Sequence, residues 1–342
     1  MMAEGKLKIA VVGVGHLGKE HARVYSQLPN VELVGVVDID EEQGRAVAKR
    51  LGTNFYSSVE ELDGKASAVS VVVPTRAHYD VASYFLKRGI PVMLEKPMAG
   101  DLKEAMALDE LSVKGGTILQ VGYIERFNPV FRAVEEYPMV PRFIECHRLS
   151  NFNFRAKDIG VVLDLMVHDI DIILHLAKSP VKKVEAVGTR IISGKEDVAN
   201  ARIIFENGCV ANVTASRVSF RPMRKIRLFS ENVYISLDYE GQEAIIYKKS
   251  PKLTLDSLNL EGLDAKSLID LKDYDFGDLL EVKHIKMENE QEPLKMELES
   301  FVDCVLNNSR PTVSGNEGLR ALRVATEILR KIEENQRVIA GV

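Results

Sequence analysis

Residues 9–18 read Ile-Ala-Val-Val-Gly-Val-Gly-His-Leu-Gly, an apolar run followed by glycines in the pattern G-x-G-x-x-G. A second apolar run, residues 31–37, ends at Asp38, which lies 20 residues beyond Gly18. An apolar strand, a glycine turn, a helix start and an acidic residue at this spacing are typical of a dinucleotide-binding βαβ unit. The alternative, an ordinary βα turn with a chance carboxylate, requires these features to coincide independently.

Each position in this stretch has a physical task. Gly13 permits the tight turn, Gly15 lets the backbone approach a pyrophosphate, and Gly18 lets the helix pack closely on the strand. The helix start offers free N–H groups and the positive end of its dipole to the anion. Asp38 is placed to accept hydrogen bonds from ribose hydroxyls and would repel a 2′-phosphate, so the predicted cofactor is NAD rather than NADP.

Composition limits the classes of partner. The 342 residues are 46% hydrophobic, which allows a large core and two domains, and the formal net charge is −5. An acidic chain disfavours a nucleic-acid partner, and the interrupted basic run at 221–227 is interpreted as the solvated face of a strand.

Location is predicted from what the sequence lacks. It has no apolar stretch of membrane-spanning length and no signal-peptide core, so we expect a cytoplasmic protein without a membrane partner. Cys146, Cys209 and Cys304 are widely spaced and form no C-x-x-C pair, which favours reduced packing residues over disulfides or a zinc site.

The first part of the chain alternates apolar runs with helix-like segments. Near-continuous apolar runs are typical of parallel strands that are buried on both faces. Strands are predicted at 9–12, 31–37, 69–73, 91–94 and 118–121, and helices at 17–28, 41–51, 78–88 and 102–114. The pattern predicts an α/β, doubly wound Rossmann domain over residues 1–122.

Residues 123–342 follow a different pattern, which predicts an α+β domain built on a large, mostly antiparallel sheet. Strands are expected at 143–149, 184–192, 198–205, 209–216, 226–229, 233–238 and 244–247, and helices at 129–136, 161–176, 298–306 and 318–333. Asn207-Gly208 is a strong hairpin signal. The last helix is placed to pack back on the first domain, and residues 250–291 are interpreted as extended strands and loops.

Ligands of a doubly wound sheet lie beyond the carboxyl ends of its strands, where three polar motifs occur. They are Pro74-Thr75 with His78, Glu95-Lys96-Pro97, and residues 123–129. A lysine beside the nicotinamide could hydrogen-bond the reacting hydroxyl, although in isolation a surface Glu-Lys-Pro turn is the simpler interpretation of Lys96. A cis peptide before Pro97 would fix this loop.

Asp164 and His168 are spaced i, i+4 in a predicted helix and therefore project from one face. A histidine so placed can accept a proton from an alcohol. Spacing alone slightly favours the alternative, a solvated polar face that also carries Asp171 and His175. A metal site is not expected, because no wider ligand set is evident.

Taken together, these motifs resemble the glucose-fructose oxidoreductase and inositol dehydrogenase (Gfo/Idh/MocA) family in order and spacing over essentially the whole chain. The resemblance implies a sugar or polyol dehydrogenase whose open second sheet covers the nicotinamide and mediates homo-oligomerisation, as a dimer or tetramer. It also implies catalytic roles for Lys96, Asp164 and His168, with His168 as general base. The expected cofactor set is Gly13, Gly15, His16, Leu17, Gly18, Asp38, Pro74, Thr75, His78, Glu95 and Lys96.

Met166 departs from the glycine that many relatives have at this position. With residues 124–129, this variant resembles a branch acting on nucleotide-linked amino sugars. The implied reaction is oxidation of the 3-hydroxyl of UDP-N-acetylglucosamine to a 3-keto sugar, which serves lipid A biosynthesis. The expected substrate contacts are Tyr123, Arg126, Asn128, Arg155, Asp164 and His168.

The two arginines in this set are candidates to meet the substrate diphosphate, although structural ion pairs are the commoner role of such residues. A free sugar or inositol dehydrogenase and a non-catalytic NAD-sensing regulator remain the alternative functions.

Overall fold

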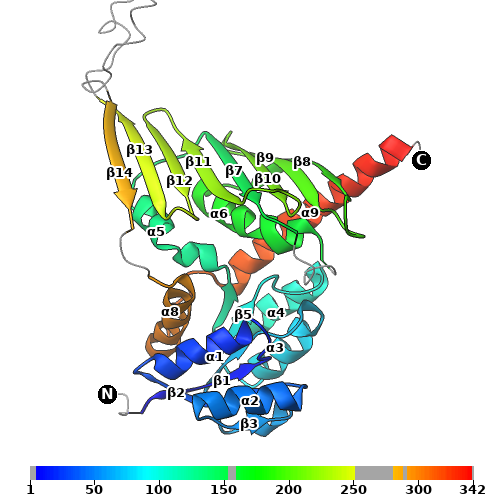
Figure 1. Ribbon diagram of the computed structural model, residues 1–342, viewed down its shortest axis with the longest axis vertical. Helices are drawn as coiled ribbons and strands as arrows, with labels where there is room; N and C mark the ends of the chain where they lie inside the picture. Colours follow the sequence, from blue (N-terminus) through cyan, green and yellow to red (C-terminus); the bar gives the residue numbers. More distant parts are fainter. Residues whose placement is uncertain (1–4, 153–158, 251–279, 288–290, 341–342) are drawn as a thin grey trace, which may run out of the picture.

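The computed structural model describes residues 5–152, 159–250, 280–287 and 291–340, and its chain forms two sheets (Figure 1). Arg155 and most of the segment predicted as extended strands and loops, residues 251–279 and 288–290, lie outside the described residues. The first sheet is wholly parallel, with the order β3-β2-β1-β4-β5-β6. Its strands are β1 (Leu7–Val12), β2 (Val31–Val37), β3 (Phe55–Tyr56), β4 (Ala68–Val71), β5 (Val92–Glu95) and β6 (Leu119–Gly122).

The first sheet confirms the predicted doubly wound domain. The helices around it are α1 (Gly18–Gln27), α2 (Glu41–Leu51), α3 (His78–Leu86) and α4 (Leu102–Gly115), with short 3-10 turns η1 (Glu60–Leu62) and η2 (Thr75–Ala77). Local chemistry fixes several helix ends. Asp40 and Asp101 accept N-cap hydrogen bonds at the starts of α2 and α4, and Gly52 and Gly116 end those helices in the left-handed conformation. The two-residue strand β3 was not predicted, because so short a strand shows no periodicity.

The second sheet is mixed but mostly antiparallel, as predicted. Its order is β14-β13-β12-β11-β7-β10-β9-β8, and β7 with β10 is its parallel pair among the described strands. The strands are β7 (Phe143–Leu149), β8 (Val181–Thr189), β9 (Val198–Phe205), β10 (Val210–Ser216), β11 (Met223–Phe229), β12 (Val233–Asp238), β13 (Glu243–Lys249) and β14 (Leu280–Lys286). Gly208, at φ 84°, forms the predicted turn between β9 and β10.

Helices cover one face of this second sheet in the described part of the chain (Figure 1). They are α5 (Pro129–Glu135), α6 (Val167–Ala177) and α9 (Gly315–Ala340), together with the π-helical turn η4 (Val162–Met166). Helix α8 (Pro293–Asn307) instead lies against α1 and the 3-10 turn η3 (Ile124–Phe127). Along β7, Ile144, Cys146 and Arg148 are buried on the helix-covered face. Their neighbours in the strand point to the opposite face.

Two C-terminal helices join the two sheets. Leu298 and Phe301 of α8 are buried in the same core as Tyr25 of α1. Helix α9 begins beside β6, where the Val121 N–H donates to the Val313 carbonyl, and it packs on both α4 and β8. No described helix is long and apolar enough to cross a membrane.

Candidate active site at the strand ends of the first sheet

A cavity of about 810 Å³ lies at the carboxyl ends of the parallel strands. Nine residues of the predicted cofactor set line it: Gly13, Gly15, Leu17, Asp38, Pro74, Thr75, His78, Glu95 and Lys96. His16 is exposed in the same loop, and neither it nor Gly18 belongs to the cavity wall. The position agrees with the rule that open α/β sheets bind ligands beyond their strand ends.

The glycine loop leaves room for a dinucleotide. A Cβ at Gly18 would lie 1.9 Å from the Gly13 carbonyl oxygen, so any larger residue would displace the turn. A Cβ at Gly15 would meet no atom within 4 Å, and Gly15 lines the cavity. The backbone there is open to a ligand that approaches closely, as a pyrophosphate does in this type of loop.

Asp38 is held in place at the end of β2. Its carboxylate accepts hydrogen bonds from the Val14 N–H at 2.7 Å and the Asp40 N–H at 2.9 Å. The Gln43 amide adds a longer contact at 3.4 Å. These bonds point the carboxylate along the cavity rim, where it fits the ribose hydroxyls of NAD and opposes a 2′-phosphate. The residues present therefore fit NAD.

Contacts with buried side chains hold the loop after β5 in place. The Lys96-Pro97 peptide is cis, as predicted. The buried His78 ring bridges two loops, with Nδ1 2.8 Å from the Pro97 carbonyl oxygen and Nε2 2.8 Å from that of Val73. Burial lowers the pKa of His78. The Glu95 carboxylate lies 3.2 Å from Nε2 of the buried His21.

Lys96 contacts Asp164, one of the two residues predicted to act with it, although the two lie on segments that belong to different sheets. Its Nζ donates to the Asp164 carbonyl oxygen at 2.7 Å and lies 3.4 Å from the Asp164 carboxylate. Asp164 lies in the π-helical turn η4, not in the regular α-helix that the i, i+4 spacing predicted. Such single turns recur at functional sites, because they redirect side chains and backbone groups.

The surroundings of His168 favour its neutral form at physiological pH. Burial is the main cause that lowers its pKa well below the ordinary value, and the charges of Lys96, Arg148 and Arg224 act in the same direction. Its Nδ1 is buried and has no hydrogen-bond partner among the described residues. The ring of Tyr123 stands edge-on to the His168 ring, with centroids 6.2 Å apart. A neutral imidazole beside an ammonium group can accept a proton.

A buried ion-pair cluster fixes the start of α6. The Arg148 guanidinium donates to both Asp169 oxygens, at 2.9 and 2.8 Å, and to Glu125 at 2.8 Å. Burial disfavours the Arg148 charge, but the two carboxylates outweigh it and hold the pKa of Arg148 well above its usual value. The cluster places the residue next to His168 firmly against the sheet.

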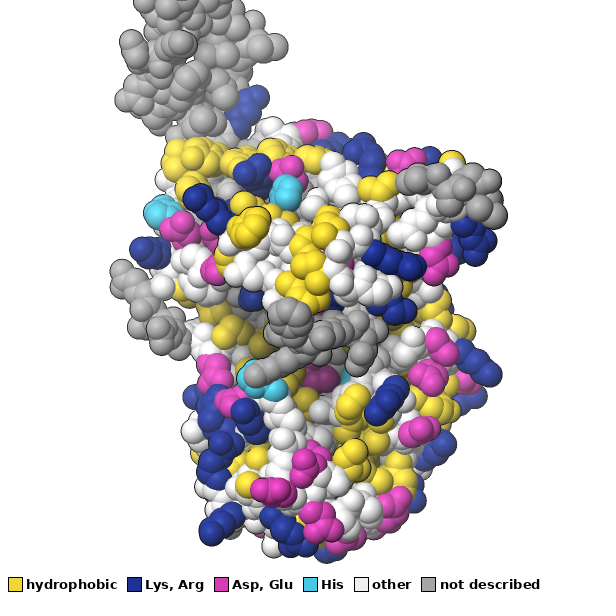
Figure 2. All heavy atoms as spheres, turned by 45° about the vertical axis from the view of Figure 1, so that its right-hand side comes forward, with side chains coloured by type: hydrophobic (Ala, Val, Ile, Leu, Met, Phe, Trp, Pro, Cys, Tyr) yellow, Lys and Arg dark blue, Asp and Glu magenta, His cyan; other side chains and the backbone are white. Residues whose placement is uncertain are grey.

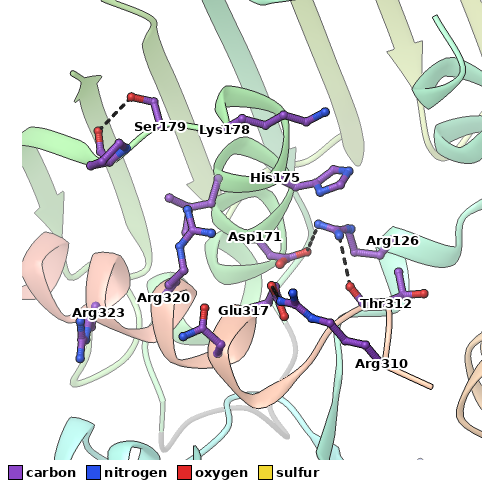
Figure 3. Close-up of a pocket in the computed structure, with 13 residues that line it drawn as sticks. Arg126, Asp171, His175, Lys178, Ser179, Arg310, Thr312, Glu317, Arg320 and Arg323 are labelled. Atoms are coloured by element: carbon purple, nitrogen blue, oxygen red, sulfur yellow. Dashed lines mark hydrogen bonds and ion pairs between the residues drawn. The ribbon is translucent and has the colours of Figure 1, made fainter. Parts of the chain in front are cut away.

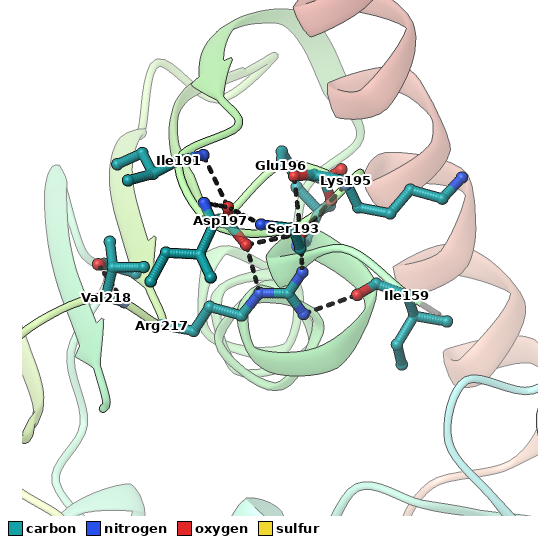
Figure 4. Close-up of polar contacts among 11 residues, drawn as sticks. Ile159, Ile191, Ser193, Lys195, Glu196, Asp197, Arg217 and Val218 are labelled. Atoms are coloured by element: carbon teal, nitrogen blue, oxygen red, sulfur yellow. Dashed lines mark hydrogen bonds and ion pairs between the residues drawn. The ribbon is translucent and has the colours of Figure 1, made fainter. Parts of the chain in front are cut away.

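A second buried network holds the turn that carries Asp164 (Figure 4). The Arg217 guanidinium donates to Asp197 at 2.8 Å and to the Ile159 carbonyl at 2.7 Å. The Glu196 carboxylate accepts from the Val162 N–H at 3.2 Å, which caps the start of the π-helical turn. Burial opposes ionisation of Asp197, but backbone N–H groups of residues 191–193 donate to it and hold its pKa well below the usual range.

Two predicted substrate residues have other partners. Asn128 is buried, caps α5 through the Val130 N–H at 3.2 Å and donates to Glu125 at 3.2 Å. Arg126 is buried and lies beside Asp171, in a different cavity. Structural contacts occupy the Asn128 side chain, and Arg126 faces the other cavity, so the structure does not bring them together with Lys96 and His168.

Arg224 is a further basic residue near the candidate site. It belongs to the basic run 221–227, for which the sequence predicts only a solvated strand face. It lies directly across from Arg148 in the β11–β7 ladder, so both side chains leave the same face of the sheet. Its charge is one of those that lower the pKa of His168, and the residue is exposed. The alternation along residues 223–229 was the available signal, since it places every second side chain toward the helices.

Metal chemistry has no visible basis in the described ranges, where no three His, Cys, Asp or Glu side chains form a group that could hold an ion. The three cysteines are free and buried, and burial raises the pKa of Cys209 to about 11.

Comparison with known proteins gives consistent matches along the chain. Residues 7–123 match the model of an oxidoreductase family with an NAD-binding Rossmann fold, and residues 131–235 match the GFO/IDH/MocA C-terminal domain. A protein of Acidithiobacillus ferrooxidans named UDP-N-acetylglucosamine 3-dehydrogenase is 36% identical over 244 residues, which are 71% of this chain and 77% of that protein.

Solved structures and a further relative extend the likeness. A crystal form of UDP-N-acetylglucosamine 3-dehydrogenase from Acidithiobacillus ferrooxidans superimposes with a TM-score of 0.84 at 30% identity, covering 96% of this chain and 98% of that chain. The scyllo-inositol 2-dehydrogenase (NAD(+)) of Bacillus subtilis is 30% identical over 236 residues, 63% of this chain and 69% of that protein.

Proposed function

The chain belongs to the GFO/IDH/MocA family of NAD-binding oxidoreductases, and on this premise we propose that it oxidises a secondary hydroxyl of a nucleotide sugar. The family and the NAD cofactor predicted from the sequence are thereby confirmed. The proposed substrate is UDP-N-acetylglucosamine, oxidised at its 3-hydroxyl to a 3-keto sugar. The similar dehydrogenase of Acidithiobacillus ferrooxidans supports this choice.

One observation carries the proposed chemistry. The Lys96 ammonium group lines the cofactor cavity and also touches Asp164, close enough to His168 to lower the pKa of that imidazole. In this proposal a proton donor, a neutral base and a carboxylate would act together at the nicotinamide end of the cofactor. This set suits removal of a proton from an alcohol.

Each of the three residues would have a separate role in removal of the hydroxyl proton. When bound, NAD supplies a hydride acceptor. Lys96 would donate a hydrogen bond to the substrate oxygen and stabilise negative charge as it develops. His168 would accept the hydroxyl proton, since it is held neutral. Asp164 would orient Lys96 through its carbonyl oxygen, at 2.7 Å, and its carboxylate, at 3.4 Å.

Arg224 is the residue we propose for recognition of the substrate diphosphate. Its exposed guanidinium leaves the sheet on the same face as Arg148 and acts on His168. Arginine suits this role, because its planar fork binds phosphate oxygens in pairs. The position of Arg126 argues against the same role for that residue, and Arg155 lies outside the described residues.

The proposed assembly is a homo-oligomer formed through the outer face of the second sheet. Phe143, Phe229, Tyr234 and Tyr247 form a continuous row of aromatic rings across four adjacent strands, with centroids 4.9–5.6 Å apart. Figure 2 shows hydrophobic side chains gathered on the surface of this half of the molecule. Apolar patches of this kind favour association. The cytoplasmic location and the role in lipid A biosynthesis stay predictions.

The substrate assay measures NADH absorbance with UDP-N-acetylglucosamine, free N-acetylglucosamine, glucose and myo-inositol, with a trap for the keto product. Turnover confined to the UDP-sugar is the expected result. Inositol turnover would favour the second candidate, a polyol dehydrogenase, which the scyllo-inositol relative supports. NAD binding without turnover on any substrate would favour a regulator.

Lys96→Met tests the catalytic assignment. Loss of one donor that stabilises developing negative charge costs about 10²–10³-fold, so we expect kcat/KM to decrease by this factor while the melting temperature stays unchanged. Lys103→Met, a change of an exposed lysine on α4, is the matched control and should retain full activity. An equal rate for Lys96→Met and the wild type would remove Lys96 from the mechanism.

A further inference from the structure

A second cavity, of about 780 Å³, lies between α6 and α9 and is lined by none of Lys96, Asp164 and His168 (Figure 3). Arg126 from η3, Arg310 from the segment before α9, and Arg320 from α9 point into the space between the two helices. We call it the cationic cavity. Its volume lies within the range of small-molecule sites.

Basic side chains outnumber acidic ones in the cationic cavity. Five line it, Arg126, Lys178, Arg310, Arg320 and Arg323, against the two carboxylates of Asp171 and Glu317. Glu317 is already paired with Arg310 at 2.6 Å and also caps the start of α9 by accepting from the Ser314 N–H at 2.9 Å. The excess positive charge therefore has no internal counterpart on the cavity wall.

The Arg126 guanidinium in the wall of the cationic cavity has unsatisfied hydrogen-bonding capacity. The side chain is 4% exposed, and its Nη1 lies 3.7 Å from Asp171 Oδ2, beyond hydrogen-bond distance. Neither atom has a hydrogen-bond partner within the described ranges, and the Arg126 Nη2 contact with the Thr312 carbonyl is long, at 3.5 Å. Buried hydrogen-bond donors normally have an acceptor within hydrogen-bond distance. A ligand with acceptor oxygens would meet this requirement.

The Arg320 guanidinium is available to bind a ligand. It is exposed on α9, and across the described segments its guanidinium has neither an ion pair nor a hydrogen bond. The other basic residues of α9 in ion pairs, such as Arg330, lie farther along the helix. The geometry points to a binding site for a diphosphate group in the cationic cavity, separate from the dehydrogenase site.

The ligand class follows from charge and size. Two adjacent phosphates offer enough oxygens to contact Arg126, Arg310 and Arg320 together, whereas a single phosphate offers fewer. The cavity volume also admits a nucleoside attached to the diphosphate. Asp171 and His168 lie on one helix, one turn apart, so an occupied cavity would sit close to the catalytic base.

The test is calorimetric titration of inorganic pyrophosphate into protein saturated with NAD, which keeps the glycine loop filled. We expect a pyrophosphate binding event in the wild type that is at least about tenfold weaker in Arg320→Ala and weaker again in Arg310→Ala/Arg320→Ala, since each lost charge-assisted contact removes roughly this factor. Any binding at Arg224 should be the same in all of these proteins. Arg337→Ala removes an exposed arginine of the same helix outside the cavity and should bind as the wild type does. Circular dichroism checks that each variant is folded.

The outcomes separate cleanly. No binding in the wild type, equal binding in Arg320→Ala, or an equal loss in Arg337→Ala would each overturn the proposal. A parallel titration with ADP identifies the source of the diphosphate: tighter binding than pyrophosphate, with the same dependence on Arg320, indicates a nucleotide, and weaker binding indicates a free diphosphate. The measurement does not use dehydrogenase turnover, so it stands apart from the proposed reaction.

Discussion

Replacement of Arg148 by methionine tests whether the buried ion-pair cluster holds α6 on the sheet. Met fills similar space but leaves Asp169 and Glu125 buried without their cation. Both carboxylates are more than nine-tenths buried, and Arg148 donates three hydrogen bonds of 2.8–2.9 Å to them. Removal of one partner from a buried ion pair costs about 3–5 kcal/mol.

The expected loss of stability in Arg148→Met is smaller than the sum of the contributions of its three hydrogen bonds. Each hydrogen bond to a charged group contributes about 1.5–3 kcal/mol, but loss of the guanidinium also removes its own desolvation cost. We therefore expect the free energy of unfolding to fall by about 3–5 kcal/mol near pH 7.5. Urea unfolding followed by far-UV circular dichroism measures it, since the chain has no tryptophan.

The pH dependence gives a second signature. Burial already raises the pKa of Asp169 in the wild type, and loss of Arg148 removes its main opposing influence. A carboxyl group whose pKa is higher in the folded state contributes most stability at low pH, and this contribution is lost as pH rises through the folded pKa. The deficit of Arg148→Met should therefore shrink as pH falls from 7.5 toward the ordinary carboxyl range.

A matched control separates burial from charge. Arg227 on β11 donates to Glu145 on the neighbouring strand at 3.0 Å, but its side chain is 47% exposed. Arg227→Met should cost only about 0–1 kcal/mol. Equal losses in the two variants, or a deficit of Arg148→Met that grows as pH falls, would refute the reasoning. Adding Asp169→Asn to Arg148→Met should recover part of the stability, because it removes an unpaired buried charge.

Further predictions concern the cofactor and the base. Gly15→Ala adds a methyl group in open space, so we expect an unchanged melting temperature without NAD but about tenfold weaker NAD binding in calorimetry; equal affinity would contradict the role of this loop. Asp38→Ala should raise the affinity for NADP relative to NAD by about tenfold in fluorescence titrations, and an unchanged ratio would exclude Asp38 as the discriminator. Because the wild-type His168 pKa is lowered, mainly by burial and then by Lys96, the acid limb of kcat/KM should fall below pH 6.5. NMR titration should show this pKa rising in Lys96→Met, and no change would remove the Lys96 charge as a cause.

The two ion-pair networks explain how residues from the segments of two different sheets keep a fixed position relative to one another in the candidate site. Lys96 follows a strand of the first sheet, whereas Asp164 lies in the π-helical turn that leads into α6 on the second sheet. Arg217 and Glu196 hold the chain at Ile159 and Val162, immediately before Asp164. Positioning of this kind decides whether reacting groups meet at productive distances.

The sequence by itself determined the features that depend on near neighbours. The glycine loop, the acidic end of β2, the caps of α2 and the Asn207-Gly208 hairpin are all set by local backbone chemistry, and the structure forms each of them. Apolar periodicity likewise predicted the ends of most strands to within two or three residues of their observed positions. Propensity and pattern act over a few residues, so one chain is sufficient to read them.

Only the tertiary structure decided which side chains share a site. Arg126 and Arg224 look alike in sequence, yet one is buried against α6 beside Asp171 and the other lies across a strand pair from Arg148. Asp164 lies in a π-helical turn, held by contacts with residues more than 30 positions away. Strand register and packing between distant segments set these directions, and a one-residue change of register reverses the face of every side chain.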